Sequence, residues 1–222
     1  ARRRRGAHRR GDGLHPPARG DPGRPPLADL RELRPGRRAA LEAAGARILR
    51  PLTDGTLGSD TQPFAGRIAL DGNLTAALLA DIARSPLFAC ADLRVAPASP
   101  GKAERLLALL PHPGLTLYVN LEEAGLLCQT RFDNAPTAAA ALIARGVRRV
   151  LVTNGGRATA DGSDDGVLSE TPPEVLVTRV TGAGDTFMAA HVVAEGRGAS
   201  RAEALHHALR AAADYVSGDI SS

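Results

Sequence analysis

The chain is poor in cysteine and in long apolar runs, and both shortages exclude classes of protein. Its two cysteines, Cys90 and Cys128, stand far apart in apolar surroundings, which predicts buried thiols in a reducing compartment and excludes a disulfide framework. No apolar run approaches the roughly 20 residues of a membrane span, and no secretory leader pattern is present. The sequence therefore predicts a cytoplasmic protein without a membrane partner.

Aromatic residues make up 3% of the 222 residues, and the first fifty positions have none. That stretch nevertheless carries about half of the basic residues, and arginine clusters contact phosphates. Without aromatic side chains to stack on bases, we expect no specific nucleic-acid binding. Its prolines, glycines and lack of apolar periodicity predict disorder for residues 1–63. Because Lys102 is the only lysine, the gene reads as GC-rich, and we favour translation of this segment from another frame or a misplaced start.

From residue 64 onward, apolar strand candidates alternate with helical patterns. This alternation is typical of βαβ units and predicts an α/β fold with a mostly parallel sheet, whose ligands gather at the carboxyl ends of its strands. A short element of undecided type precedes it at Leu41–Leu49. The expected strands are Ile68–Leu70, Leu93–Ala96, Leu115–Val119, Val150–Thr153 and Val175–Thr178, and the expected helices cover about 75–83, 100–110, 122–127, 136–145, 185–195 and 201–216.

One glycine-rich string lies between an apolar run and a helical pattern, and the rest of the chain is organised around it. It reads Thr181-Gly182-Ala183-Gly184-Asp185-Thr186-Phe187. Glycines at such a junction let backbone N–H groups converge on an anion, and the helix end adds partial positive charge. A carboxylate there repels phosphate, so its useful role is to accept a proton from an attacking hydroxyl. The alternative is an ordinary helix N-terminus after a glycine turn.

The string resembles the second signature of the ribokinase-like (PfkB) carbohydrate kinases. The resemblance implies a three-layer α/β/α fold, Asp185 as catalytic base, and an anion hole beside the nucleotide. The residues implied in that hole and nucleotide site are Thr181, Gly182, Ala183 and Gly184. Arg179 stands where the family has Asp or Asn, a residue that in many members helps to hold a monovalent cation. Its guanidinium either replaces the charge of that cation or abolishes the site.

Two further strings lie at expected strand ends. Asn120 and Glu123 share one face of a first helical turn, where they either order a magnesium-bound water or form a capping box. Spacing alone favours the capping box. The family has an Asn-x-x-Glu element here, and the resemblance implies magnesium and phosphate binding. Thr153 and Gly155 resemble the start of the family's Thr-x-Gly-x-x-Gly nucleotide loop, although Ala158 replaces its second glycine and a simple turn is the alternative.

Two strings resemble those of the pseudouridine kinase branch, Asp71-Gly72-Asn73-Leu74 and Pro97-Ala98-Ser99-Pro100-Gly101-Lys102-Ala103. The resemblance implies substrate contacts for Asn73, Ser99 and Lys102, while Ala96 replaces the usual Asp. A solvated lysine on a helix is the alternative for Lys102.

The resemblance covers residues 64–222, the carboxyl-terminal part of a family member. The amino-terminal strands, the sugar-gripping Asp and the lid are not found in residues 1–63, so we expect an exposed sheet edge and an uncovered apolar face. The implied function is transfer of the γ-phosphoryl of Mg²⁺-ATP to a sugar or nucleoside, at the 5-hydroxyl of pseudouridine. The alternatives are a nucleotide-binding remnant or pseudo-kinase without catalysis, and a basic-arm nucleic-acid-binding protein. The sequence leaves open whether the protein forms a homodimer.

Overall fold

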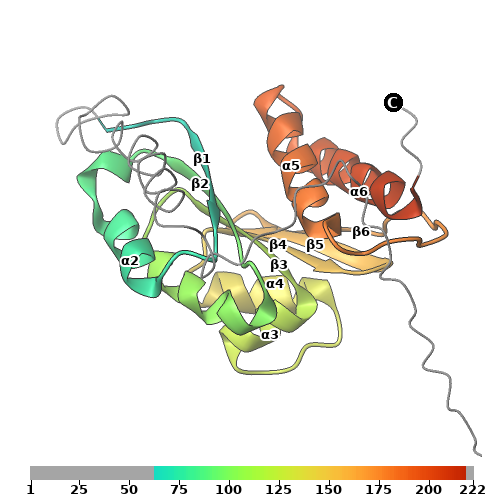
Figure 1. Ribbon diagram of the computed structural model, residues 1–222, viewed down its shortest axis with the longest axis horizontal. Coiled ribbons are helices and arrows are strands. Elements are labelled where there is room, and N and C mark those ends of the chain that lie inside the picture. Colours follow the sequence, from blue (N-terminus) through green and yellow to red (C-terminus); the bar gives the residue numbers. More distant parts are fainter. Residues whose placement is uncertain (1–62, 219–222) are drawn as a thin grey trace, which may run out of the picture. The chain divides into compact units, whose positions relative to one another are not determined.

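The computed structural model describes residues 63–218 and contains one mixed sheet with helices on both faces (Figure 1). The strands lie in sequential order: β1 Arg67–Asp71, β2 Asp92–Ala96, β3 Leu115–Asn120, β4 Arg149–Asn154, β5 Arg157–Ser163 and β6 Gly166–Glu170. Strands β1 to β4 pair in parallel, whereas β4–β5 and β5–β6 are antiparallel. The predicted α/β class with a mostly parallel sheet is confirmed. Nearly all of the predicted segment 1–63, with the element at Leu41–Leu49, lies outside these residues.

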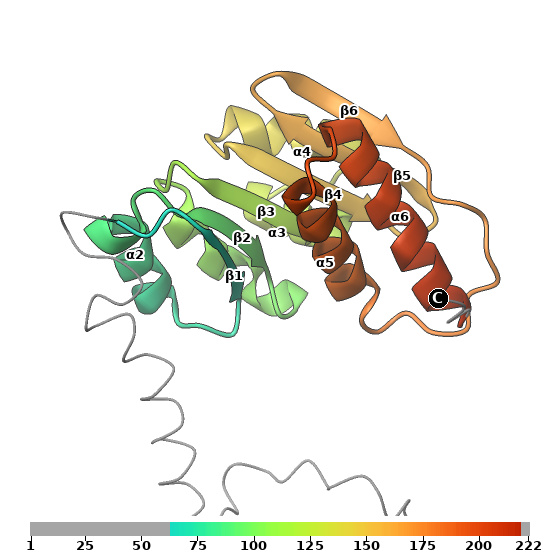
Figure 2. The ribbon, with the colours of Figure 1, turned by 90° about the horizontal axis from the view of Figure 1, so that it is seen from above.

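The helices form two layers, one on each face of the sheet (Figures 1 and 2). One layer holds α2 Ala76–Arg84, the single turn η1 Pro86–Phe88, η2 Pro100–Leu109, α3 Leu121–Cys128 and α4 Ala135–Ala144, and the other holds α5 Ala183–Gly196 and α6 Arg201–Ser217. The predicted helices are confirmed, although η2 is a 3₁₀ helix. As predicted, the Thr75 side chain caps α2 by accepting a hydrogen bond from the Leu78 N–H. None of the described helices is long and apolar enough to cross a membrane.

Alternate residues of the strands feed two apolar cores, one on each face. On the α2–α4 face, Leu93 and Val95 of β2 and Leu117 of β3 are fully buried among helix residues. On the other face, a smaller cluster seats α5 and α6 on the sheet, and its members are Tyr118, Leu151, Phe187, Leu205, Ala208 and Leu209. Phe187 is the last residue of the glycine-rich string, so its burial fixes the start of α5 against β3 and β4.

The strand predicted at Val175–Thr178 is wrong. Residues 171–180 have no regular structure, and Leu176 is 83% exposed. Their apolar, β-branched composition favours a strand, but no described strand lies beside them to complete a ladder. The Thr178 N–H instead donates to the Val216 carbonyl at the end of α6, 2.8 Å away.

Strands β5 and β6 were not predicted. Strand β5 carries the fully buried Asp161, which breaks the apolar alternation that marks a strand. Burial of this carboxylate is tolerated because Arg149 pairs with it at 2.7 Å and Arg201 at 3.1 Å. The sequence pattern does not indicate this strand, because the arginines that neutralise its buried aspartate lie elsewhere in the chain.

Strand β1 lies at one edge of the described sheet, and its α5-side face carries charged residues. The α5-side residues of β1 are Arg67, Ala69 and Asp71, all exposed. Arg67 pairs with Asp92 at 3.1 Å and donates to the Val192 carbonyl of α5. Charged side chains therefore occupy this face of β1, and the exposed edge and uncovered apolar face stay predictions.

The prediction of buried thiols is wrong for Cys90 and holds only in part for Cys128. Both are free, but Cys90 is exposed and Cys128 is half-buried. Cys90 follows the single turn η1, in a bend that leads to β2, and turns of this kind run along the surface. Burial raises the pKa of the Cys128 thiol.

A network of charged side chains anchors α5 to the sheet. We call Asp92, Arg94, Arg149, Asp161 and Glu195 the α5 charge network. Glu195 of α5 bridges two strands, with one carboxylate oxygen 2.5 Å from Arg94 of β2 and the other 2.5 Å from Arg149 of β4. Arg94 also binds Asp92 through two hydrogen bonds, and Arg149 binds Asp161 in the same way. Burial alone would raise the Glu195 pKa, but the two arginines lower it overall.

His191, fully buried beside this network, predicts a pH-dependent stability. Its Nδ1 lies 2.9 Å from the Tyr118 hydroxyl. Burial, opposed by Glu195 and supported by Arg149, lowers the His191 pKa to about 4 from 6.5. Between those pH values the unfolded chain binds a proton that the folded chain does not, so stability is lost as the pH falls. We expect this residue to contribute at most about 1.4 kcal/mol per pH unit.

Denaturant unfolding at several pH values from 7 to 4 checks this expectation. The His191→Gln variant is the comparison, because it removes the titrating group whatever its own cost at neutral pH. Its free energy of unfolding should fall less steeply with acid than that of the parent chain. Parallel curves would contradict the assignment.

Candidate active site

The glycine-rich string forms the start of α5. Gly182 is the N-cap residue and has a left-handed backbone with φ of 91°, which favours glycine. The backbone N–H and the hydroxyl of Thr186 both donate to the Gly182 carbonyl at 2.9 Å, which fixes the first turn. Asp185 lies in that turn, is exposed, and makes no hydrogen bond or ion pair with other described residues. The carboxylate predicted as the base is therefore open to an incoming hydroxyl.

The two glycines of the string have different surroundings. A Cβ atom at Gly182 would lie 2.6 Å from the Tyr215 hydroxyl, closer than real contacts allow. A Cβ atom at Gly184 would meet nothing within 4 Å. The first glycine is therefore required by packing and by its backbone angle, whereas the second leaves open space beside the helix N-terminus.

The three amides predicted to form an anion hole are not equivalent. The Ala183 N–H donates to the Val180 carbonyl at 3.1 Å, so a turn already uses it. The Gly184 N–H belongs to the first helical turn, where backbone donors have no intrahelical partner and the helix dipole adds positive charge. The anion-hole role of Gly182, Ala183 and Gly184 stays a prediction, in which Gly184 is the best-placed donor.

A cavity of about 740 Å³ lies beside this helix start, and we call it the β3–β4–α5 cavity. It brings together predicted residues from three elements: Asn120 at the end of β3, Thr153 and Gly155 at the end of β4, and Ala183 and Gly184 of α5. These residues are far apart in the sequence, and the sheet places the two strand ends together, because Asn120 pairs directly with Thr153. Of the other residues predicted for the nucleotide and catalytic site, Thr181, Gly182, Asp185 and Glu123 do not line it.

The remaining walls of this cavity are largely apolar, and Glu174 is the one charged residue among the described residues that line it. One wall is the segment that precedes α5, where Val175, Val177 and Val180 line the cavity. Another wall is a face of α6, formed by Leu209, Ala212, Ala213 and Val216. Sequence reasoning missed both walls, although a signal was present, because Val175 and Val177 of the run mistaken for a strand line the cavity. An apolar slot that ends at a helix N-terminus suits a flat ring attached to an anionic group.

Asn120 and Glu123 form the capping box of α3. The Asn120 side-chain oxygen accepts from the Glu123 N–H at 2.9 Å, and Glu123 Oε2 accepts from the Asn120 N–H at 2.8 Å. Burial raises the Glu123 pKa, opposed by the backbone hydrogen bond. Glu123 Oε1 has no partner within the described part of the chain. The magnesium role of this pair stays a prediction.

Thr153 and Gly155 lie where β4 turns into β5. The Thr153 hydroxyl donates to the Val119 carbonyl at 3.5 Å, and Gly155 has a positive φ of 57°. Asn154 pairs with Arg157 across the turn, so Gly155 and Gly156 form a two-residue hairpin connection that lines the cavity. The alternative of a simple turn is therefore correct for the backbone, while the nucleotide role stays a prediction.

The residues predicted to bind substrate gather at the carboxyl ends of β1 and β2. The Lys102 ammonium donates to the Asn73 side-chain oxygen, and the Asn73 amide donates to Asp71 at 2.9 Å. The Ser99 carbonyl accepts from the Lys102 N–H at 2.9 Å. Arg105, one helical turn beyond Lys102 and missed by sequence reasoning, donates weakly to the Asn73 carbonyl. The structure therefore brings the three predicted residues together, although none of them lines the β3–β4–α5 cavity.

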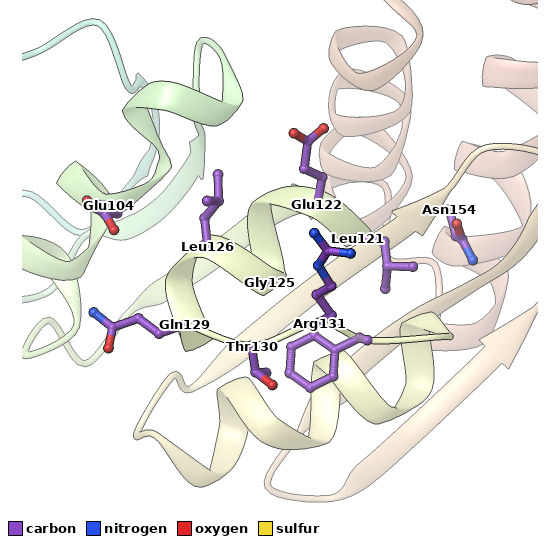
Figure 3. A pocket seen from close by; sticks show the side chains of 10 residues that line it. Glu104, Leu121, Glu122, Gly125, Leu126, Gln129, Thr130, Arg131 and Asn154 are labelled. Carbon is purple, nitrogen blue, oxygen red and sulfur yellow. The ribbon is translucent and has the colours of Figure 1, made fainter.

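A second cavity, of about 800 Å³, lies along α3 (Figure 3). Its polar groups come from separate elements, with Glu104 on η2, Glu122 on α3 and Arg131 beyond it. No predicted site residue lines it, and its two carboxylates outnumber the single guanidinium of Arg131, so its net charge opposes a phosphate. The β3–β4–α5 cavity is therefore the better candidate for an anionic ligand.

Comparison with known proteins gives one family. The sequence profile described as "pfkB family carbohydrate kinase" matches residues 65–217, which is well over half of the chain. No curated protein sequence matches the chain. Among solved structures, a carbohydrate kinase from Agrobacterium tumefaciens is similar at 26% identity and a TM-score of 0.61, over 79% of this chain and 54% of that one.

Two more distant structures show the same fold. An adenosine kinase from Sinorhizobium meliloti matches at 19% identity and a TM-score of 0.58, over 69% of this chain and 49% of that one. Arabidopsis thaliana ribokinase complexed with ribose and ATP matches at 23% identity and a TM-score of 0.56, over 68% of this chain and 49% of that one. The described residues therefore have a ribokinase-like α/β fold, and the chain spans about half the length of these structures.

Proposed function

We propose, because the chain belongs to the pfkB family of carbohydrate kinases, that it binds ATP in the β3–β4–α5 cavity and transfers the γ-phosphoryl group to a sugar or nucleoside hydroxyl. One observation carries the proposal: an apolar slot between the 175–180 segment and α6 ends at the N-terminus of α5. The slot suits the adenine ring, and the helix end suits the phosphates. The Arabidopsis relative was solved with ribose and ATP, which supports the choice of nucleotide.

In this proposal Asp185 is the general base. It accepts the proton of the attacking hydroxyl, while the Gly184 amide and the dipole of α5 stabilise charge on the transferred phosphoryl group. The exposure of Asp185 and its lack of a described partner suit this role, because the carboxylate must reach an acceptor that arrives from solvent.

Asn120 and Glu123 are the residues proposed to serve Mg²⁺. Their oxygens are the donors that Mg²⁺ prefers, and Mg²⁺ usually retains several waters, so contact through water suits a pair already used in a capping box. When bound, the ion neutralises charge on the nucleotide phosphates. Asn120 lines the cavity, and the free Oε1 of Glu123 is the acceptor available to a bound water.

For the acceptor we propose a nucleoside or sugar, with the 5-hydroxyl of pseudouridine as the specific candidate. Asn73, Ser99 and Lys102 offer an amide, a hydroxyl and an ammonium within one cluster, which suits hydroxyl and ring-carbonyl groups. We place the reaction in the cytoplasm, where ATP is available and two free thiols are stable.

A second candidate is nucleotide binding without catalysis. It is favoured by one observation, that Asp185 does not line the cavity in which we place ATP. ATP binding without turnover on any tested acceptor would support this candidate. Turnover that depends on Asp185 would exclude it.

ATP binding in the cavity predicts the effect of one charge. The Val180→Glu variant should weaken ATP binding by at least about tenfold, because the new carboxylate would face the phosphates. Val180 is 70% exposed, so the fold should tolerate the change. Isothermal titration calorimetry with Mg²⁺-ATP measures the dissociation constant.

Leu176→Glu is the matched control for this test. Leu176 belongs to the same segment and is 83% exposed, but it does not line the cavity. It receives the same charge and should bind ATP as the parent chain does. Equal dissociation constants for the two variants would argue against the proposed cavity.

A further inference from the structure

The segment that leads into the glycine-rich string is tied to the end of α6. The N–H groups of Thr178 and Arg179 and the Thr178 hydroxyl all donate to the Val216 carbonyl, at 2.8, 3.2 and 3.0 Å. Figure 2 shows the connection from β6 to α5 passing beside this end of α6. The last carbonyls of a helix have no intrahelical partner and lie at the negative end of its dipole. These contacts therefore use the helix end to hold the segment.

Arg179 adds a fixed positive charge to this contact. Its Nε donates to the Tyr215 carbonyl at 2.6 Å, and its guanidinium lies over the Tyr215 ring, 4.0 Å from the centroid. The Tyr215 hydroxyl then donates to the Thr181 carbonyl at 2.8 Å, directly before the crowded Gly182. We call Arg179, Tyr215 and these contacts the Arg179 latch. It connects the end of α6 to the first residues of the predicted anion site.

The residues present do not fit the monovalent cation that the family resemblance implies at this place. Potassium is held by sets of carbonyl or carboxylate oxygens, and here a guanidinium stands in place of a carboxylate or carboxamide. The nearby carbonyl oxygens are already used: Tyr215 accepts from Arg179, Thr181 accepts from Tyr215, and Val216 accepts from three donors. A cation would have to compete with these donors for the carbonyl lone pairs and lie beside a permanent charge.

We propose that the Arg179 latch takes the place of a bound monovalent cation, so that the phosphate-binding end of the site works without potassium. Arg179 is a positioning residue, which acts through Tyr215 and the Thr181 carbonyl on the start of α5. The proposal rests on the proposed function for its nucleotide readouts, but not for its stability readout.

The first test compares the parent chain in potassium, sodium and tetramethylammonium chloride at equal ionic strength. The dissociation constant of Mg²⁺-ATP should agree within about twofold in the three salts. The midpoint of thermal unfolding without nucleotide should also be the same, because a specifically bound ion would stabilise the folded chain. A potassium-specific rise in either quantity, by about tenfold in affinity or by several degrees in the midpoint, would overturn the proposal.

The second test separates positioning from general stability. Arg179→Ala should weaken ATP binding by about tenfold in every salt but weaken adenosine binding much less, because the latch holds the phosphate end and not the apolar slot. Arg179→Lys should recover only part of the loss, since an ammonium lacks the planar fork. Arg210→Ala is the control, an exposed arginine of α6 without a described partner.

Tyr215→Phe keeps the test decisive if Arg179→Ala does not fold. It retains the ring under the guanidinium and removes only the bond to the Thr181 carbonyl. We expect the dissociation constant of ATP to rise more than that of adenosine. An equal rise in both dissociation constants would show that the latch is only a structural contact and would overturn the proposal. If no nucleotide binds in any salt, the proposed function fails, and the thermal midpoints still decide whether a potassium site exists.

Discussion

Asp185→Asn is expected to lower the rate of phosphoryl transfer by about a hundredfold or more, with the dissociation constant of ATP within about twofold of the parent value. The two side chains have the same shape, but a carboxamide cannot accept the proton of an attacking hydroxyl. Asp185 is exposed and makes no described contact that the substitution would break, so the fold should not change. The loss should therefore appear in kcat and not in nucleotide binding.

The assay uses Mg²⁺-ATP with pseudouridine, uridine and ribose as separate acceptors. Asp165→Asn is the matched control, because Asp165 is an exposed carboxylate in the turn between β5 and β6, away from the site. A variant that kept more than about a tenth of the parent rate would remove Asp185 from the role of base. A parent chain that binds ATP without turnover on any acceptor would support the non-catalytic candidate.

Three strands of the parallel half, β2, β3 and β4, could be predicted because they are covered on both faces. Strands β2, β3 and β4 are short apolar runs between turn residues, which is the pattern of a covered parallel sheet. The caps were equally readable, since Thr75 and Asn120 lie immediately before helical periodicity and bond to the third residue beyond them. In these places the local signal and the tertiary environment agree.

Two of the errors in the strand assignment, the strand placed at Val175–Thr178 and the missed β5, have one cause. In each case the residue pattern reflects a partner elsewhere in the chain. Val175 and Val177 line a cavity beside α6 and do not join the sheet, whereas Leu176 between them is 83% exposed and does not line it. Strand β5 contains an aspartate because arginines from β4 and α6 surround that position. The alternation of apolar and polar residues indicates which residues of an element are buried. It does not indicate which other element packs against them.

The candidate site was predicted in its polar part and missed in its apolar part for the same reason. Asp185, Asn120 and Thr153 belong to short strings whose chemistry is local, so each could be found separately. The slot between the 175–180 segment and α6 exists only once the chain is folded, and its small residues, such as Ala212 and Ala213, resemble those of any helix face. The sequence also does not distinguish the two glycines of the string, although a Cβ atom would collide with a neighbour only at Gly182.

Glu195→Ala is expected to lower the free energy of unfolding by about 3 to 5 kcal/mol, the usual cost of breaking a buried ion pair by removing one partner. Without this carboxylate, the guanidinium groups of Arg94 and Arg149 that it now bridges would face each other with no anion between them. Denaturant unfolding at neutral pH measures the loss as a lower midpoint at an unchanged slope. Glu104→Ala is the control, since Glu104 is exposed and has no described partner.

The same variant tests whether the α5 charge network matters to the site. Helix α5 carries Glu195 near its C-terminus and Asp185 in its first turn, so one rigid element links the network to the predicted base. Phe187 and the Arg179 latch hold the start of the helix independently of Glu195. We therefore expect ATP binding by the folded fraction of Glu195→Ala to stay within about threefold of the parent chain despite its lower stability. A loss of ATP affinity as large as that of Arg179→Ala would show instead that the two ends of α5 are held as one unit.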